Sequence, residues 1–282
     1  MAIYYMDGEF QDDNTAVVSV KDMIVLRGFG VFDFLRTYNR RPFYLDEHIQ
    51  RLINSASYIG LELQHSKEEI CDIVQQTIDK NPEFEECNIR IVYSGGISSD
   101  GVTPEGNGKL IVMVTSKHVN PDSWYTDGAK IITADVERYI PESKSTNYLN
   151  AVIAQQKAKK QGAIEAIYID RDDRVLEGTT TNIFGIKDGR LITPDRDILP
   201  GVTRRVILER AKNILDIELR DVKRSELFEF DEVFIAASNK EIIPVIQIND
   251  KTIADGKPGK FTMEILQDFA KYTTAYGATI KA

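Results

Sequence analysis

The order of strand-like and helix-like runs most constrains the fold of this chain. Residues Ile3 to Phe10 alternate around Asp7-Gly8, a dipeptide that favours a tight turn between two antiparallel strands. Runs rich in β-branched and aromatic residues follow at Val31–Tyr38, Ile89–Tyr93 and Leu110–Thr115. The chain is therefore expected to open in antiparallel sheet and to continue with further strands.

Two helices are predicted between these strands. Asp46 is the predicted N-cap of the first helix and Gly60 its end, with apolar residues at the i, i+3, i+4, i+7 spacing of one helical face. Ser66 and Glu69 have the spacing of a capping box, which starts the second helix. Asn81-Pro82 stops that helix, because proline cannot continue it.

The second half of the chain also mixes strands with helices. The predicted helices are Leu149–Gln161, one that opens at Leu199–Thr203, and Phe261–Tyr276; the predicted strands are Lys130–Ala134, Ala163–Asp170, Asn182–Ile186, Arg190–Thr193 and Glu232–Ala237. A polar stretch near residue 120 separates the halves. We therefore expect a mixed α/β (α+β) fold in two domains, an N-terminal α/β domain at 1–120 and a C-terminal α/β domain at 125–282.

Composition and motifs argue against several functional classes. A hydrophobic share of 42% and a charged share of 28% are typical of a globular protein, and no apolar run is long enough to cross a bilayer. The net charge of −9 argues against a nucleic-acid or membrane surface. Cys71 and Cys87 have no nearby ligands, so neither a metal site nor a disulfide framework is expected. The start of the chain lacks a signal-peptide pattern, which favours a cytoplasmic location.

The glycine-rich loop 95–108 has two glycines spaced as in a phosphate loop. Asn107 stands where that motif requires a lysine, and a strand rather than a helix follows the loop. The loop is therefore not interpreted as a nucleotide-binding site.

Lys144 lies in the polar, turn-prone segment Pro141–Asn150, just before a predicted helix. Most lysines of such a chain are charged surface residues. A lysine that loses its proton near neutral pH can instead attack a carbonyl and form a Schiff base. If Lys144 does so with an aldehyde cofactor that carries a pyridine ring and a phosphate, the chain must also supply a carboxylate for the ring nitrogen and a phosphate site.

Both of these groups are available. Glu177 lies at a strand end, before glycine and hydroxyl residues, and its carboxylate could keep a pyridine nitrogen protonated. Gly201-Val202-Thr203 opens a helix, and the N–H groups and dipole of a helix start attract anions. Arg51 would add positive charge, and Ser238-Asn239 would add further donors.

Five motifs occur in one order along nearly the whole chain: Glu47-His48-Ile49-Gln50-Arg51-Leu52, Lys144 with Asn147-Tyr148, Glu177-Gly178 with Asn182, Leu199-Pro200-Gly201-Val202-Thr203-Arg204, and Asp231-Glu232-Val233-Phe234. In these motifs the chain resembles the class IV (fold type IV) pyridoxal-phosphate-dependent aminotransferases. That family includes branched-chain and D-amino-acid aminotransferases and 4-amino-4-deoxychorismate lyase. The resemblance implies two α/β domains with pyridoxal 5'-phosphate between them, in a homodimer whose partner chain completes the pocket.

The resemblance also implies roles for single residues. Lys144 would form the Schiff base and move protons, Glu177 would face the pyridine nitrogen, and Tyr148 would hydrogen-bond the ring hydroxyl. The phosphate would be bound by Arg51, Val202, Thr203 and Ser238.

Substrate choice depends on the residues that hold the α-carboxylate, for which the planar fork of arginine is suited. Arg36 and Arg90 lie where branched-chain enzymes carry arginines, but Phe32-Asp33-Phe34-Leu35-Arg36 departs from their Phe-Glu-Gly-Ile-Arg motif. The Arg-x-His carboxylate site of the well-known D-amino-acid enzymes is absent too. Arg27 together with Arg90 resembles an atypical group of D-amino-acid aminotransferases. Arg27, Arg36, Arg90 and Asn239 are therefore the candidate substrate-binding residues.

The favoured function is transamination of a D-amino acid, such as D-alanine or D-glutamate, with 2-oxoglutarate or a similar 2-oxo acid as acceptor. A branched-chain L-amino-acid aminotransferase, 4-amino-4-deoxychorismate lyase and a non-catalytic binding protein of the same fold are the alternatives. The expected partners are amino acid and keto acid substrates and a second copy of the chain, without nucleic acid, membrane or metal.

Overall fold

The computed structural model describes residues 1–278, which form two compact units. The first unit comprises Met1–His118, Glu142–Tyr148 and the C-terminal residues from Thr274, and the second comprises Val119–Pro141 and Leu149–Thr273. The segment that carries Lys144 thus belongs to the first unit, whereas the sequence placed it in a C-terminal domain. Backbone hydrogen bonds explain the difference: Phe32 N donates to Lys144 O, and Thr146 N donates to Gly30 O, each over 2.9 Å.

The first unit contains one six-stranded sheet in the order β2-β1-β6-β5-β3-β4, with all neighbours antiparallel. Its strands are β1 (Ile3–Met6), β2 (Glu9–Asp12), β3 (Gly30–Tyr38), β4 (Arg41–Pro42), β5 (Cys87–Ser94) and β6 (Leu110–Ser116). The predicted hairpin at Asp7-Gly8 is confirmed, since β1 pairs with β2 around it and both turn residues have positive φ. The predicted strand after the loop 95–108 is β6.

The helices of the first unit are α1 (Met23–Arg27), α2 (Leu45–Tyr58) and α3 (Lys67–Asp79). The capping box of Ser66 and Glu69 is confirmed at the start of α3. The prediction of Asp46 as N-cap of α2 is wrong, because Tyr44 holds that position with a left-handed φ of 51°. Asp46 lies instead in the first turn, where its charge is favourable to the helix dipole.

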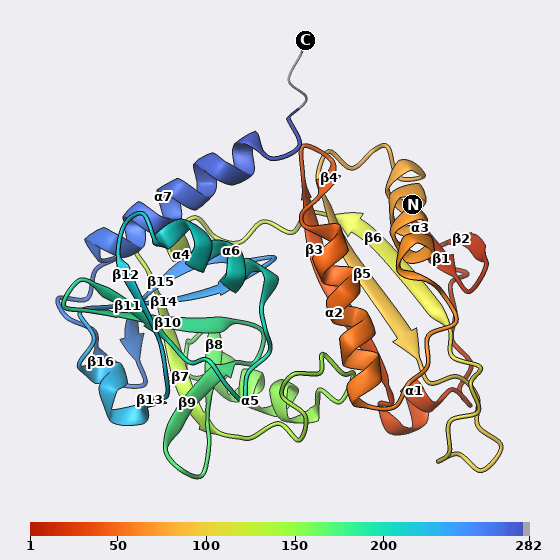
Figure 1. Cartoon of the computed structure of the whole chain (residues 1–282), viewed down its shortest axis with the longest axis horizontal. Coiled ribbons are helices and arrows are strands. Elements are labelled where there is room, and N and C mark those ends of the chain that lie inside the picture. The colour runs from red at the N-terminus through yellow and green to blue at the C-terminus, as the bar shows by residue number, and fades with distance from the viewer. Residues whose placement is uncertain (279–282) are drawn as a thin grey trace. The chain divides into compact units, whose positions relative to one another are not determined.

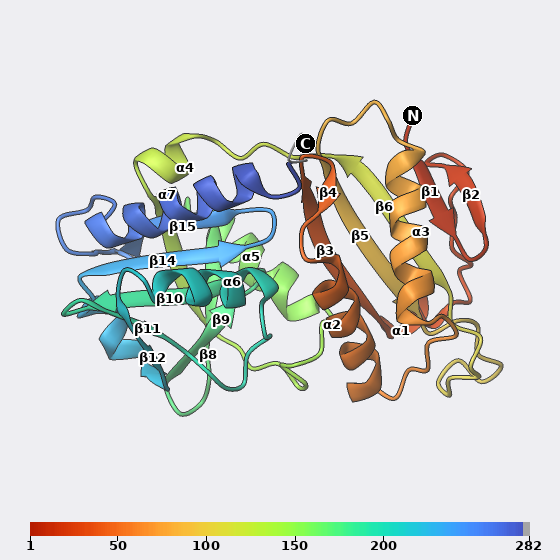
Figure 2. The same cartoon turned by 45° about the horizontal axis from the view of Figure 1, so that its top comes forward.

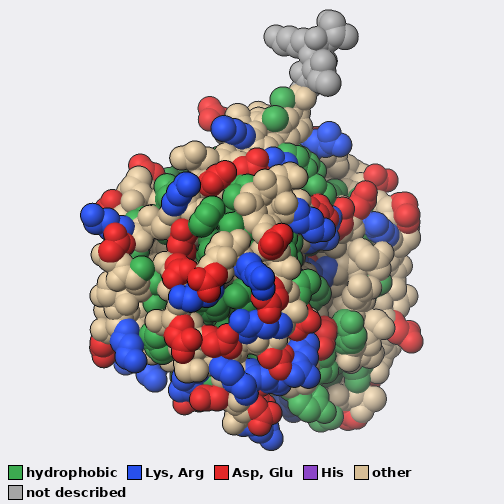
Figure 3. Space-filling view, turned by 60° about the vertical axis from the view of Figure 1, so that its left-hand side comes forward, with side chains coloured by type: hydrophobic (Ala, Val, Ile, Leu, Met, Phe, Trp, Pro, Cys, Tyr) green, Lys and Arg blue, Asp and Glu red, His purple; other side chains and the backbone are tan. Residues whose placement is uncertain are grey.

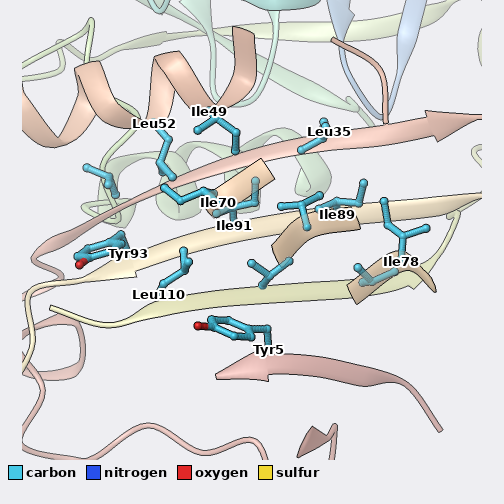
Figure 4. Close-up of a cluster of buried hydrophobic side chains, with 14 of the residues drawn as sticks. Tyr5, Leu35, Ile49, Leu52, Ile70, Ile78, Ile89, Ile91, Tyr93 and Leu110 are labelled. Carbon is cyan, nitrogen blue, oxygen red and sulfur yellow. The ribbon is translucent and has the colours of Figure 1, made fainter. Parts of the chain in front are cut away.

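Helices α2 and α3 pack on the same face of this sheet. Figure 4 shows the buried cluster between them and the strands, with Ile49 and Leu52 from α2 above Ile89 and Ile91 from β5. These side chains are fully buried, and burial of each stabilises the fold by about 1.5–3 kcal/mol. The first unit therefore has a hydrophobic core of its own.

The second unit contains a ten-stranded mixed sheet in the order β12-β11-β10-β14-β15-β7-β8-β9-β13, and β16 pairs with β15 (Figure 1). Its strands are β7 (Ala129–Asp135), β8 (Glu165–Ile169), β9 (Arg174–Gly178), β10 (Asn182–Lys187), β11 (Arg190–Thr193), β12 (Asp216–Leu219), β13 (Val222–Lys223), β14 (Glu232–Ala237), β15 (Glu241–Ile248) and β16 (Lys251–Thr252). Its helices are α4 (Ser123–Thr126), α5 (Leu149–Lys160), α6 (Val202–Ala211), the 3₁₀ helix η1 (Arg224–Phe228) and α7 (Lys260–Ala275), whose last residues belong to the first unit.

The alternating residues of β8 face two different hydrophobic clusters. Ala166 and Tyr168 pack with Ala154 and Ala158 of α5, while Ile167 and Ile169 face the cluster that includes β14 and β15. Both faces of the strand are buried, as expected for a continuous apolar run beside a parallel neighbour. In Figure 2, α6 and α7 lie beside β14 and β15; α6 contacts β14, whereas α5 contacts β7 and β8.

Charged side chains of both signs cover the exterior. In Figure 3 the Lys and Arg side chains alternate with the Asp and Glu side chains over the face in view. Among residues 1–278, no helix combines the length and the apolar character that a membrane span requires.

Candidate active site

The backbone of Lys144 is held between α2 and β3. Its N–H donates to Ser55 Oγ over 3.0 Å, and its carbonyl accepts from Phe32 N. The preceding residue adds a further bond, because Ser143 Oγ donates to Ser55 O over 3.0 Å. A lysine in a turn-prone segment is thus placed by two elements that lie far away in the sequence.

The amine of Lys144 lies over an aromatic ring. Its Nζ is 4.7 Å from the centroid of the Phe32 ring, and Tyr148 packs edge-to-face on the same ring at 5.3 Å. The side chain is only partly exposed. The amine is therefore held beside an aromatic surface in a position that is still open to a small aldehyde.

A buried charge cluster lies next to this segment. Asp33 of β3 accepts from Arg51 Nε at 2.9 Å and Arg51 Nη2 at 2.7 Å, and its Oδ1 is 2.7 Å from His48 Nδ1. Burial would raise the pKa of Asp33, but Arg51 and His48 lower it below its ordinary value. Burial lowers the pKa of His48, with a partial offset from Asp33, so this imidazole is neutral near pH 7. The backbone of Arg51 also touches the lysine segment through Ser55, whose hydroxyl donates to Arg51 O.

Glu177 of β9 is buried in the second unit, with 5% of its surface exposed. Its Oε2 accepts from Leu199 N over 3.0 Å, and its Oε1 forms an ion pair with Arg138 Nε at 3.3 Å. Burial lowers the pKa of nearby Arg204, which Asp195 and Glu177 partly offset. A buried carboxylate with these cationic neighbours suits a protonated ring nitrogen.

The start of α6 has the features of an anion site. Gly201 is the N-cap and has no side chain with which to cap the helix. A Cβ on Gly201 would lie 2.1 Å from Asn182 Oδ1, so a larger residue here would have to displace the Asn182 side chain. Thr203 in the first turn has its hydroxyl 3.4 Å from that of Ser238, which follows β14. Two hydroxyl groups beside a helix start of this kind fit a phosphate group.

Comparison with known proteins decides the family. The family described as amino-transferase class IV matches residues 30–248. This chain belongs to the class IV aminotransferases. It is 34% identical to a protein of Methanocaldococcus jannaschii named provisionally as a branched-chain-amino-acid aminotransferase, with 98% of each chain covered. It is 32% identical to the D-alanine aminotransferase of Staphylococcus aureus strain N315, over 96% of this chain and 98% of that one.

Solved class IV structures share the fold type IV arrangement. The branched-chain amino acid aminotransferase of Escherichia coli aligns with a TM-score of 0.91 and 27% identity, covering 97% of this chain and 95% of that one. The branched-chain enzyme of Thermoproteus uzoniensis, solved with norvaline, aligns with a TM-score of 0.90 and 26% identity, covering 98% and 96%. A further branched-chain enzyme, complexed with N-(5'-phosphopyridoxyl)-L-glutamate, has a TM-score of 0.91 at 26% identity, covering 97% and 94%. The predicted mixed α/β fold and aminotransferase family are confirmed.

The candidate substrate arginines of this class IV aminotransferase have different surroundings in the first unit. Arg90 is exposed on β5, and its guanidinium carbon is 5.4 Å from the Phe32 ring centroid and 5.3 Å from that of Phe34. Arg36 is buried, 4.2 Å from the ring centroid of Tyr38. Arg27 is exposed, and its Nη1 donates to Leu26 O. Arg90 is therefore the one that shares an aromatic ring with Lys144.

Sequence reasoning missed several residues near the candidates. They are Asp33 and His48 beside Arg51, Ser55 beside Lys144, Arg138 beside Glu177, and the buried pair of Glu165 and Lys240. Asp33 carried a readable signal, since an acidic residue that alternates with Val31 and Leu35 in a strand must face the same core and needs a partner. The others gave no local signal, because their partners are far away in the sequence.

Proposed function

We propose that this class IV aminotransferase uses pyridoxal 5'-phosphate to transfer the amino group of a D-amino acid, such as D-alanine or D-glutamate, to 2-oxoglutarate or a similar 2-oxo acid. The cofactor supplies an aldehyde that bonds amines and a pyridine ring that withdraws electrons from the α-carbon. Its proposed contacts are Lys144, Arg51, Tyr148, Glu177, Val202, Thr203 and Ser238. The solved complex of a branched-chain relative with a phosphopyridoxyl-glutamate supports this choice of cofactor.

The observation that carries the proposal is the setting of Lys144. Its backbone is held on both sides, and its amine lies at 4.7 Å over Phe32 in a partly exposed position. Such a lysine is accessible to an aldehyde and held in one place.

Each protein group then has a defined task. Lys144 Nζ would hold the aldehyde of the cofactor and, when free of it, would accept a proton from the substrate α-carbon and return it. The Glu177 carboxylate, held by Leu199 N and Arg138, keeps the ring nitrogen protonated. Val202 and Thr203 at the start of α6 and the Ser238 hydroxyl hold the phosphate, and Arg51 adds charge.

Arg90 is the proposed carboxylate-binding residue, with Arg27, Arg36 and Asn239 as further candidates. The rings of Phe32 and Phe34 support its guanidinium, which leaves the planar fork oriented for a carboxylate. Phe34 occupies the position of the glycine in the branched-chain motif, and this departure makes the branched-chain reaction the less favoured one. The branched-chain L-amino-acid reaction is the second candidate, because the Methanocaldococcus jannaschii relative bears that provisional name.

Cofactor attachment tests the role of Lys144. Purified wild-type protein with pyridoxal phosphate should gain visible absorbance, and borohydride reduction followed by peptide mass spectrometry should locate the cofactor on Lys144. Lys144→Ala should lose this attachment and all transamination, with a loss of at least about 10³-fold. Lys157→Ala, an exposed lysine on α5, is the matched control and should behave as the wild type. Cofactor attached to another lysine would refute the assignment.

A substrate panel tests the reaction. D-alanine, D-glutamate, L-leucine and L-valine are each offered with 2-oxoglutarate, and turnover with the D-amino acids is the expected result. Turnover with L-leucine and L-valine alone would favour the second candidate, and 4-aminobenzoate formed from aminodeoxychorismate would favour the lyase. A homodimer and a cytoplasmic location remain predictions from the sequence, and sedimentation velocity checks the first.

A further inference from the structure

Two turns of the second unit carry candidate cofactor residues. One follows β9, which carries Glu177, and comprises residues 179–181; the other joins β14 to β15 and comprises residues 238–240. About 60 residues of chain separate them, and the turn 238–240 contains Ser238 and Asn239. Their relative position must therefore come from tertiary contacts.

A buried ion pair links these turns. Glu165 at the start of β8 has no exposed surface, and Lys240 is 8% exposed. Lys240 Nζ donates to Glu165 Oε2 over 3.0 Å and to Thr180 Oγ1 over 2.7 Å. Lys240, in the turn between β14 and β15, thus contacts the buried Glu165 carboxylate of β8 and the Thr180 hydroxyl of the turn after β9.

The remaining oxygen sites of Glu165 hold the turn after Glu177. Oε1 accepts from Thr179 N and Ala166 N, each over 3.1 Å, and from the Thr179 hydroxyl; Oε2 accepts from the Thr180 hydroxyl over 2.7 Å. A Cβ on Gly178 would lie 3.0 Å from Glu165 Cγ and 2.2 Å from Thr181 Oγ1, so this turn packs tightly on the glutamate. Burial would raise the pKa of Glu165, but Lys240 and the two threonine hydroxyls lower it.

The turn of Lys240 is anchored on its other side as well. Asn120 Nδ2 donates to Asn239 O over 3.0 Å, and the Tyr125 hydroxyl donates to Lys240 O over 3.2 Å. The backbone of this turn is thus fixed to α4 and its preceding segment, and the Lys240 side chain transfers that position to the turn after Glu177.

Stability alone does not account for such a pair. A buried ion pair loses about as much in desolvation as it gains in attraction, and apolar replacements of similar volume are often neutral or stabilising. The pair does impose fixed hydrogen-bond directions, which an apolar contact cannot do. We propose that Lys240 and Glu165 are positioning residues that hold the turn after Glu177 in register with the turn of Ser238, so that the ring-nitrogen and phosphate contacts of one cofactor stay in place. This inference rests on the proposed function.

Lys240→Met tests the inference, because it keeps the length of the side chain and removes its charge and donors. We expect pyridoxal phosphate to bind roughly ten- to a hundredfold more weakly, since an error of about 1 Å in a positioning contact has effects of this size. Without cofactor, hydrogen exchange at the Thr179 amide should become faster, although the substitution lies in the other turn. Lys240→Arg, which keeps the charge and donors, should recover most of the affinity.

Arg210→Met is the matched control. It removes another ion pair of the same unit, Arg210 Nε with Asp268 at 2.5 Å, and should leave cofactor affinity and Thr179 exchange unchanged. If Lys240→Met does not fold, Glu165→Gln takes its place, with the same expected loss of affinity. Wild-type affinity and unchanged Thr179 exchange in the Lys240 or Glu165 variants would overturn the inference, as would an equal loss in Arg210→Met.

The two proposals fail in different ways. A wild-type protein that does not bind pyridoxal phosphate refutes the proposed function and, with it, the role of Lys240 toward a cofactor. Wild-type protein that binds the cofactor at Lys144, together with a Lys240→Met variant of equal affinity, refutes only the positioning role.

Discussion

Asp33 is an aspartate in the middle of a strand, and its surroundings explain why it keeps its charge there. It has no exposed surface, and Arg51 contacts both of its oxygens while His48 contacts one. Removal of one partner from such a cluster leaves a buried charge and costs several kcal/mol. If Arg51 contacts the phosphate as predicted, it must do so while it also neutralises Asp33.

His48 makes stability depend on pH. Because the folded-state pKa of His48 lies below its ordinary value of 6.5, the unfolded chain binds more protons as the pH falls. The free energy of unfolding should therefore be highest above pH 6.5 and fall by about 1 kcal/mol per pH unit below it. Asp33 does not add to this slope, because its pKa is depressed below 3.8 and the stability it contributes is lost only as the pH falls below that value.

Urea unfolding between pH 7.5 and 5.5 checks this expectation. The wild type should lose stability on acidification, and His48→Gln, which does not titrate, should show a smaller slope whatever its absolute stability. His65→Gln is the control histidine. Equal slopes in the wild type and His48→Gln would show that another group controls the effect.

Helix ends set the paths between the elements of the first unit. The left-handed Tyr44 precedes α2, whose buried face carries His48 and Arg51. The capping box of α3 acts differently, through side-chain bonds at Ser66. A side chain that accepts a hydrogen bond from the first turn of a helix, as Ser66 does, can be recognised in the sequence. A cap that depends only on backbone conformation, as at Tyr44, cannot.

The α3 cap yields a prediction at this scale. Ser66→Ala removes the acceptor for Glu69 N and should lower the free energy of unfolding by about 1 kcal/mol. Ser57→Ala, at an exposed position of α2, is the control and should change stability by less than about 0.5 kcal/mol. Denaturant melts measure both, and an unchanged midpoint for Ser66→Ala would contradict the assigned role of the cap.

Each of the two units has its own buried apolar cluster. The cluster of the first unit contains Ile89 and that of the second contains Ile243, and both side chains are fully buried. Within the described part of the chain, these two clusters share no residue. A substitution in one cluster should therefore destabilise the unit that contains it more than the other unit.

Core truncation in either unit tests this division. Ile89→Ala and Ile243→Ala should each cost about 2–5 kcal/mol. Hydrogen exchange should become faster mainly in β3, β5 and β6 for the first variant and mainly in β14, β15 and β10 for the second. Uniformly faster exchange in both variants would show that the units unfold as one.

The sequence by itself determined what depends on local patterns. The Asp7-Gly8 hairpin, the α3 cap, most helix and strand ranges and the family follow from turn chemistry, periodicity and five ordered motifs, because each of these is encoded within a few residues. Strand β15 was missed because its residues run directly on from the turn 238–240 without a break.

Only the tertiary structure decided which distant residues meet. It placed the Lys144 segment against β3 and α2, in the first unit, whereas the sequence suggested a C-terminal domain. It also paired Arg51 with Asp33. It also revealed the pair of Glu165 and Lys240. These contacts join residues that are far apart in the chain, and a buried charge carries no mark in the sequence of the partner that neutralises it.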